Sequence, residues 1–412
     1  MSDKTVKLHV SELRTGMYVS RLDRDWLDTP FLMQGFYIET HGDVDTVSQY
    51  CEHVWVDITR KAIVGGSSGS TPTFDPATHP HPRREDIFQE HQRSTGVFGQ
   101  ARTLTKTLLD DIQLGGIINT EAAKATVNEC VQSVIRHPDA LMWMTRLRSE
   151  SEYTAEHCLN VCILAVAFGR HLGMSEQDLQ YLGLCGLLHD VGKMRVPSQV
   201  LNKPSKLTPR EMRMMMAHTI HGRNLLLSAG NIYTGAIDVA YSHHERIDGT
   251  GYPRKLPGDS LSLFSKIISI VDAYDAMTAD RCYQKARTAT EALKIIYNER
   301  GKQFDERLAL AFLETVGLYP PGSLVELCSG QIAVVIEVNP SFRHLPVVAV
   351  ILNAEKERLP KPLIFNLALI EQSTLSKDYL VRKVHRDGSF GVSLREFQDL
   401  VLIKKTTERQ LM

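Results

Sequence analysis

The sequence predicts a mainly α-helical protein, in which a helical bundle follows a small α+β domain and precedes a β-rich extension. Two changes of hydrophobic period support this prediction, because short β-like runs give way to a helical period near residue 87 and return after residue 317. Capping motifs in the middle segment are the third observation, since they mark helix starts. The predicted parts are an N-terminal domain at 1–63, a linker at 64–86, the bundle at 87–317 and the extension at 318–412.

The N-terminal 63 residues combine short apolar runs with one helical segment. The runs are Met17–Val19, Phe36–Ile38 and Val54–Ile58, and the helix is expected near 43–52. This mixture predicts a small α+β unit. Residues 64–86 are rich in Gly, Ser, Pro and Thr, which favours a solvated linker over a packed element.

Helix starts in the bundle are marked by a hydroxyl residue followed three positions later by an acid, a pair that satisfies amides at a helix N-terminus. The pairs are Ser175 with Asp178, Thr208 with Glu211, and Thr288 with Glu291. The glycines expected where helices end are Gly173, Gly301 and Gly317. We expect eight or more helices here, and then short strands at 324–327, 332–338 and 347–352 in the extension.

Composition excludes several classes of protein. The 47 Lys and Arg against 48 Asp and Glu give a net charge of -1, without the basic surplus that binding a nucleic-acid polymer needs. The seven cysteines are scattered without a C-x-x-C pair, which argues against a disulfide framework and a thiolate zinc site. Free thiols, no signal peptide and no apolar run of about 18 residues predict a cytoplasmic protein without a membrane span. Oligomeric state stays open.

Histidines and acids gather between residues 157 and 272 of the predicted bundle. His189 and Asp190 close the apolar segment Leu182–Leu188, and polar groups at the edge of a core need partners such as a divalent metal. Three more candidates are placed on helices: His157 within Tyr153–His171, His218 on the helix that begins after Thr208, and Asp272 within Leu263–Met277.

Imidazole and carboxylate donors without thiolate suit Fe, Mn, Zn, Co or Ni better than Ca or Mg. Two metals about 3.5 to 4 Å apart need a shared carboxylate, and Asp190 is flanked by other ligand candidates. We therefore predict that Asp190 bridges them. Asp275, one turn after Asp272, is expected either to orient a ligand histidine or to be solvated, and both readings stay open.

The segments HDVGK at 189–193 and HHERIDGTGYP at 243–253 together resemble the signature of the HD-GYP family. This branch of the HD metallophosphohydrolases degrades the bacterial second messenger cyclic di-GMP with an all-helical HD-type bundle. The resemblance covers roughly residues 120–317. Residues 11–19, SELRTGMYV, resemble a small domain of unknown function that often precedes this catalytic domain.

The resemblance implies two divalent metals, with Fe or Mn expected first and Ni, Co, Zn or Mg as alternatives. One would be held by His157, His189, Asp190 and Asp272, and the other by Asp190, His218, His243 and His244. Some members hold a third metal through a Glu four residues before the first histidine. Here that position is Tyr153, and Glu156 has the wrong helical phase to replace it, so two metals are expected.

The resemblance also implies hydrolysis of cyclic di-GMP to the linear dinucleotide pGpG by a hydroxide that bridges the metals, with further cleavage to GMP left open. Asp190 and Lys193 are the expected catalytic residues, and Lys193 is expected to stabilise phosphate charge, because a Lys needs a depressed pKa to act as an acid. The expected substrate-binding residues are Lys193, Gly249, Gly251, Tyr252, Pro253, Arg281 and Lys285.

Two other functions stay open at this point. The protein could be an HD hydrolase of another signalling nucleotide, such as cyclic GMP-AMP or ppGpp. It could also be a non-catalytic adaptor that binds cyclic di-GMP. Beside cyclic di-GMP, the expected partners are signalling proteins such as diguanylate cyclases.

Overall fold

The computed structural model describes residues 5–24, 36–38, 41–57, 81, 85–147, 153–280, 285–339 and 341–397. The chain divides into two compact units, Met1–Thr73 and Phe74–Met412. Most of the predicted linker at 64–86 lies outside the described residues. His81 is an exception: it is buried, and its Nε2 lies 2.8 Å from the carbonyl oxygen of Met174.

The first unit is a four-stranded antiparallel sheet in the order β1-β4-β2-β3 with one helix. Its elements are β1 (Thr5–His9), β2 (Tyr18–Leu22), β3 (Phe36–Tyr37), α1 (His41–Tyr50) and β4 (His53–Asp57). Alternating residues of the central strands form its core, and Val19, Val54 and Val47 of α1 are all fully buried. The predicted α+β character is confirmed, and β1 was not among the predicted strands.

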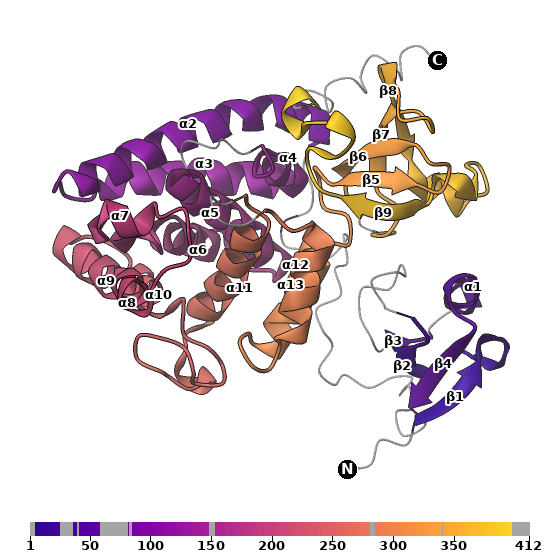
Figure 1. The fold of residues 1–412 in the computed structure, drawn as a ribbon, viewed down its shortest axis with the longest axis horizontal. Coiled ribbons are helices and arrows are strands. Elements are labelled where there is room, and N and C mark those ends of the chain that lie inside the picture. Colours follow the sequence, from indigo (N-terminus) through magenta and orange to yellow (C-terminus); the bar gives the residue numbers. More distant parts are fainter. Residues whose placement is uncertain are drawn as a thin grey trace. The chain divides into compact units, whose positions relative to one another are not determined.

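The second unit begins with the helical bundle (Figure 1). Its helices are α2 (Ile87–Gln113), α3 (Thr120–Arg136), α4 (Pro138–Met144), α5 (Tyr153–His171), α6 (Glu176–Leu188), α7 (Ser198–Leu201), α8 (Pro209–Met216), α9 (His218–Ala229), α10 (Thr234–Ser242), α11 (Leu263–Met277), α12 (Ala289–Asn298) and α13 (Glu306–Val316). A 3₁₀ turn, η3 (Val191–Arg195), follows α6 directly.

The helices begin where the capping motifs predicted. Ser175 accepts a hydrogen bond from the Asp178 amide at the start of α6, and Thr208 and Thr288 each form a full capping box. One expectation is wrong: the helix that begins after Thr208 ends at Met216, and His218 begins the next helix, α9.

Helices α5 and α6 pack closely against each other. A Cβ added at Gly186 of α6 would lie 2.9 Å from the Cα of Cys162 on α5, so this contact requires glycine. Because a short connection joins the two helices, they run antiparallel, and the start of α5 meets the end of α6. This arrangement brings His157 near His189.

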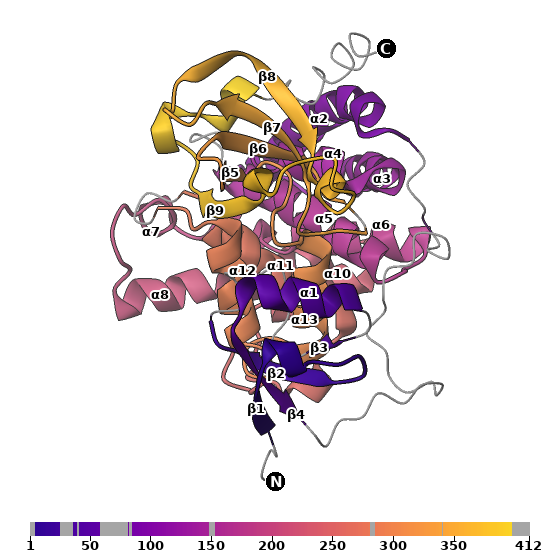
Figure 2. The same ribbon diagram turned by 90° about the vertical axis from the view of Figure 1, so that its right-hand side faces the viewer.

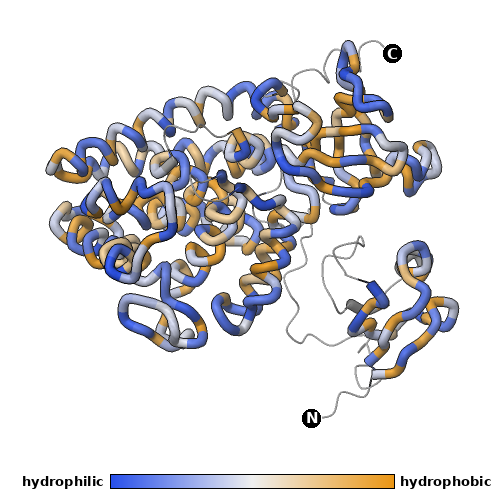
Figure 3. Tube along the Cα trace, in the orientation of Figure 1, coloured by the Kyte–Doolittle hydropathy of each residue, from blue (hydrophilic) through white to orange (hydrophobic). Residues whose placement is uncertain are grey.

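The C-terminal extension forms a five-stranded antiparallel sheet in the order β8-β7-β6-β5-β9. Its strands are β5 (Leu324–Leu327), β6 (Ile332–Glu337), β7 (Val347–Leu352), β8 (Arg358–Asn366) and β9 (Val381–His385). Figure 3 shows that β6 and β7 are largely hydrophobic, and nearly all of their residues are buried. The three predicted strands are present. Strands β8 and β9 were not predicted. Strand β8 contains Pro360 and Pro362, and proline in a sequence usually indicates the end of a strand. An edge strand such as β8 nevertheless tolerates proline.

The sheet and the bundle share one hydrophobic core (Figure 2). Trp143 and Met144 of α4 and Ile87 of α2 pack with strand residues such as Leu324 and Val334. Hydrogen bonding joins the same elements, since the Val338 amide donates to the Asp139 carboxylate at 3.0 Å. No helix within the described part of the chain is long and apolar enough to cross a membrane.

Candidate metal centre

Seven predicted ligands from six separate elements meet inside the bundle. They are His157 on α5, His189 at the end of α6, Asp190 before η3, His218 at the start of α9, His243 and His244 after α10, and Asp272 on α11. Three triplets of these residues offer ligand atoms within 4.8 Å of one another: His218, His243 and His244; His157, His189 and Asp272; and His189, Asp190 and His243.

The first side of the centre surrounds His157. Its Nε2 lies 3.1 Å from Oδ1 of Asp272 and 3.4 Å from Oδ2 of Asp190. The Nε2 of His189 lies 3.3 Å from the same Oδ2 atom. One oxygen of Asp190 therefore faces two imidazoles on this side.

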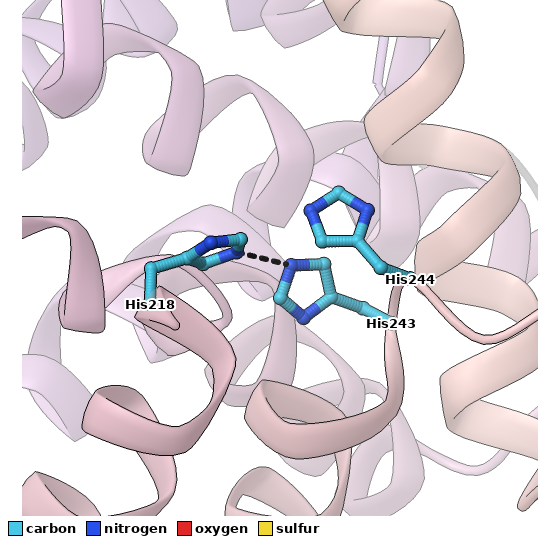
Figure 4. Close-up of side chains that lie close together, drawn as sticks. All are labelled: His218, His243 and His244. Carbon is cyan, nitrogen blue, oxygen red and sulfur yellow. Dashed lines mark hydrogen bonds between the residues drawn. The ribbon is translucent and has the colours of Figure 1, made fainter. Parts of the chain in front are cut away.

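The second side of the centre contains three histidines (Figure 4). The Nε2 of His218 lies 3.3 Å from Oδ1 of Asp190, and the Nε2 of His243 lies 3.7 Å from that oxygen. His244 lies beside His218, with ring centroids 5.0 Å apart. The two carboxylate oxygens of Asp190 therefore face two different groups of histidines.

Four of the histidines present the same nitrogen to the centre. Their Nδ1 atoms donate outward: His189 to the Gly186 carbonyl at 2.7 Å, His218 to Met215 at 2.6 Å and His243 to Val239 at 3.0 Å. The Nδ1 of His157 donates to the carboxylate of Asp275 at 2.7 Å. A neutral imidazole that donates through Nδ1 keeps a lone pair on Nε2, which is the form that binds a metal.

This tautomer makes the inner contacts unfavourable without a cation. The Nε2 atoms of His218 and His243 lie 3.3 Å apart, and the dashed line in Figure 4 joins them. Because both Nδ1 protons are used by carbonyl groups, two lone pairs face each other here. Within the described residues, the buried Nε2 of His189 and Oδ1 of Asp190 also have no hydrogen-bond partner. The donor set therefore fits divalent metal ions.

Electrostatics keep the ligands in their metal-binding forms. Burial lowers the pKa of His218 to about 4, and burial together with His244 holds the pKa of His243 well below its ordinary value. Burial alone would raise the pKa of Asp190, but the Lys193 ammonium and His189 hold it well below its ordinary value. Neutral imidazoles and an ionised carboxylate are the states that coordination requires.

A glycine in the first sequence motif allows the two halves of the centre to meet. A Cβ at Gly192 would lie 1.9 Å from the carbonyl oxygen of His218 and 2.4 Å from the amide nitrogen of Gly222. Only glycine permits this approach of η3 to α9, which brings Asp190 to His218.

The sequence position where a ligand of a third metal would be expected is Tyr153, which is not a carboxylate. Tyr153 begins α5, and the buried Glu156 pairs with Arg102 at 3.0 Å. Glu156 is in none of the potential metal-binding groups of the described residues.

The predicted substrate-binding residues lie in different places. Lys193 hydrogen-bonds to Oδ2 of Asp190. Gly251 and Tyr252 line a pocket beside His243, His244 and Asp272. Gly249 and Pro253 belong to the same loop, Lys285 is an exposed residue between α11 and α12, and Arg281 lies outside the described residues.

The pocket wall depends on close backbone contacts. A Cβ at Gly251 would lie 2.5 Å from the amide nitrogen of Arg246, so the loop can fold back only with glycine there. Tyr252 stacks on His244 with ring centroids 4.7 Å apart. Burial, with Asp272 nearby, raises the pKa of the Tyr252 hydroxyl, which therefore stays protonated.

Sequence reasoning missed several residues of this site. Arg246, Ser269 and Gln303 also line the pocket. The buried carboxylate of Glu245 accepts hydrogen bonds from the amides of Arg254 at 2.6 Å and Leu256 at 3.1 Å, which holds the loop. Arg246 and Glu245 lie inside the recognised motif, whereas nothing in the local sequence pointed to Ser269 or Gln303.

Comparisons with known proteins place this site in a class. A family model described as "HD domain" matches residues 137–308, and one described as "Domain of unknown function (DUF3391)" matches residues 5–123. A cyclic di-GMP phosphodiesterase of Pseudomonas aeruginosa is 35% identical over 86% of this chain and 87% of its own length. A cyclic di-GMP phosphodiesterase response regulator of Xanthomonas campestris pv. campestris is 37% identical over 56% of this chain and 57% of its own.

A 3'3'-cGAMP-specific phosphodiesterase of Vibrio cholerae is 36% identical over 42% of this chain and 37% of its own. Among solved structures, an HDG"Y"P protein from Bdellovibrio bacteriovorus covers 76% of this chain and 99% of its own, with 15% identity and a TM-score of 0.46.

The sequence matches and the histidine–aspartate cluster define an HD-domain phosphohydrolase, a class of enzymes that uses divalent metals. Within this class, the chain belongs to the HD-GYP family.

Proposed function

We propose that this enzyme is a metal-dependent phosphodiesterase that hydrolyses cyclic di-GMP to linear pGpG. The observation that carries the proposal is the position of Asp190, whose two carboxylate oxygens face separate groups of histidines. This arrangement is what a centre of two divalent ions needs, and Fe or Mn suits its nitrogen and oxygen donors. When bound, such ions supply charge neutralisation for a phosphodiester and an activated water.

The chain's own residues would hold and orient these components. His157, His189, Asp190 and Asp272 would hold one ion, and Asp190, His218, His243 and His244 the other. The ammonium of Lys193, hydrogen-bonded to Asp190, lies beside the centre, where it would contact a phosphate oxygen. Because this ammonium is hydrogen-bonded to a carboxylate, we assign Lys193 charge stabilisation rather than proton donation.

The pocket beside the centre would receive the rest of the nucleotide. It has a volume of about 220 Å³ and extends from His243, His244 and Asp272 to the loop of Gly251 and Tyr252. The stacked Tyr252 and His244 rings form one aromatic wall, and the loop glycines allow a ligand to approach the backbone.

The test is chromatography of the products formed when the purified protein, loaded separately with Mn or Fe, is incubated with cyclic di-GMP. We expect linear pGpG from the wild type. Asp190→Ala should lose its bound metal and at least about 10³-fold of its activity, because removing the shared carboxylate opens both sides of the centre. Elemental analysis of that variant should show less than one ion per chain, and retention of two would contradict the bridging role.

A second substrate deserves the same assay, since a 3'3'-cGAMP-specific phosphodiesterase is among the relatives. Hydrolysis of cyclic GMP-AMP in preference to cyclic di-GMP would move the protein to that specificity.

A further inference from the structure

We propose that Gln303, fixed by Arg246, selects a guanine base over an adenine base in the pocket beside the metal centre. The inference rests on the proposed hydrolysis of a cyclic dinucleotide, and it names the base chemistry that this site prefers. Gln303 lies outside both recognised sequence motifs, between α12 and α13.

The backbone places Gln303 against the loop that follows the second motif. The amide of Ile247 donates to the carbonyl of Gln303 at 3.2 Å, and the amide of Asp248 donates to the carbonyl of Lys302 at 2.8 Å. These two bonds join chain segments about 55 residues apart. The Gln303 side chain thereby becomes part of the pocket lining, together with His243, His244 and Asp272.

The side-chain amide of Gln303 has a defined orientation. The Nη1 of Arg246 lies 2.8 Å from Oε1 of Gln303. A guanidinium group only donates hydrogen bonds, so the amide atom facing it must be the oxygen. Arg246 is itself held by Asp248, with its Nη2 3.0 Å from Oδ2, and by Glu299 at 3.4 Å. An amide flip would place two donors against each other, and the orientation is therefore fixed.

This orientation decides which base fits. A free glutamine reads adenine with both amide atoms, accepting from N6 through its oxygen and donating to N7 through its nitrogen. In this protein Arg246 already donates to one of the two lone pairs of the oxygen, so the main unused groups of the amide are its two Nε2 donors, which no hydrogen bond within the described residues uses. Two donors match the O6 and N7 acceptors of guanine, whereas the N6 amino group of adenine would oppose them.

A second residue of the pocket has the complementary polarity. Ser269 donates its hydroxyl proton to the Lys266 carbonyl of its own helix at 2.9 Å, so the hydroxyl of this pocket-lining residue can only accept a further hydrogen bond. Guanine offers donors at N1 and N2 beside its O6 acceptor, while adenine offers an acceptor at N1. A donor from Gln303 and an acceptor from Ser269 thus agree with guanine.

The test uses three substrates: cyclic di-GMP, cyclic di-AMP and bis(p-nitrophenyl) phosphate, a phosphodiester without a base. In Gln303→Met, which keeps the length but loses the donors, we expect kcat/KM for cyclic di-GMP to fall about 10-fold to 100-fold, mainly through KM. The rate with bis(p-nitrophenyl) phosphate should stay within about twofold. Lys302→Met is the matched control, because Lys302 is an exposed neighbour that bonds to the loop through its backbone, and no side-chain hydrogen bond or ion pair of Lys302 is found within the described residues.

Gln303→Glu gives a second, independent readout. Its carboxylate keeps the contact with Arg246 but replaces the donors with an acceptor, so the ratio of kcat/KM values should shift toward cyclic di-AMP. If damage to the fold makes Gln303→Met inactive with bis(p-nitrophenyl) phosphate, the ratio measured for Gln303→Glu tests the inference instead. Unchanged ratios in the folded variants overturn the inference and leave the proposed function standing. A wild type that cleaves the base-free diester but no cyclic dinucleotide overturns both.

Discussion

Asp275 shows how one buried carboxylate can control a metal centre without touching it. Its side chain is fully buried, and its Oδ2 accepts the Nδ1 proton of His157 at 2.7 Å. This bond fixes both the tautomer and the ring orientation of His157. The sequence placed Asp275 one turn from Asp272 but left its partner open, because helical spacing identifies a shared face and not the side chain opposite it. The structure resolves that choice in favour of orienting the histidine.

Replacing this carboxylate should weaken the centre while leaving the fold intact. Asp275→Asn keeps an acceptor for His157 but removes the negative charge, so we expect metal affinity and kcat to fall about 10-fold to 100-fold. Competition with a chelator measures the affinity, and the far-ultraviolet circular dichroism should not change. Asp259→Asn, an exposed residue of a 3₁₀ turn, is the control. Equal chelator resistance in Asp275→Asn and wild type would refute the role.

At the level of elements, the approach of η3 to α9 determines whether the two halves of the centre meet. Gly192→Ala would insert a Cβ 1.9 Å from the His218 carbonyl oxygen, so backbone atoms must move. We expect a loss of about 1 to 3 kcal/mol in unfolding free energy. Activity should fall about 10²-fold, because moving Asp190 by 1 Å relative to His218 disturbs the shared site.

Urea unfolding and metal analysis measure these effects. Gly99→Ala is the matched control: it lies on α2 with open space around its Cβ position, and it should stabilise the protein by about 0.5 to 1 kcal/mol. A Gly192→Ala protein as stable and active as Gly99→Ala would show that the backbone contact is unimportant.

The helices and strands also show which features of the fold can be predicted from sequence patterns. The limits of α5 and α11 agree with the predicted spans, since each is a long apolar helix with clear boundaries. The break between α8 and α9 was missed, because Ala217 is neither Gly nor Pro and only contacts with distant segments distinguish the two helices. Strand β8 was missed because its prolines are tolerated only at a sheet edge, and edge positions are a property of the assembled sheet.

For the whole molecule, the proposed ligand set was selected from the sequence chiefly through family resemblance. His157 and Asp272 are more than a hundred residues apart, and their 3.1 Å contact follows from packing of α5 against α11. Hydrophobic period predicts each helix but not which faces meet. The proposed role of Gln303 is harder to predict from the sequence, because it depends on Arg246, a partner 57 positions away that fixes the orientation of its amide.

The shared core of bundle and sheet leads to a prediction for truncated chains. Removal of residues 318–412 would expose Trp143, which is fully buried, together with Ala140 and Met144 of α4. Burial of each large apolar side chain stabilises the folded protein by roughly 1.5 to 3 kcal/mol. The truncation should therefore lower the free energy of unfolding by more than a typical domain tolerates. Because α4 leads toward α5 and His157, metal binding should be lost as well.

The opposite truncation is the control. A chain beginning at Phe74 removes only the first compact unit and leaves every residue of the metal centre in place. We expect this protein to melt cooperatively, to retain its metal and to cleave the base-free diester at the wild-type rate. The chain ending at Gly317 should instead aggregate or show red-shifted Trp143 fluorescence and no bound metal. Cooperative melting of that shorter chain at the wild-type temperature would mean that the sheet adds little to the stability of the bundle, despite the core they share.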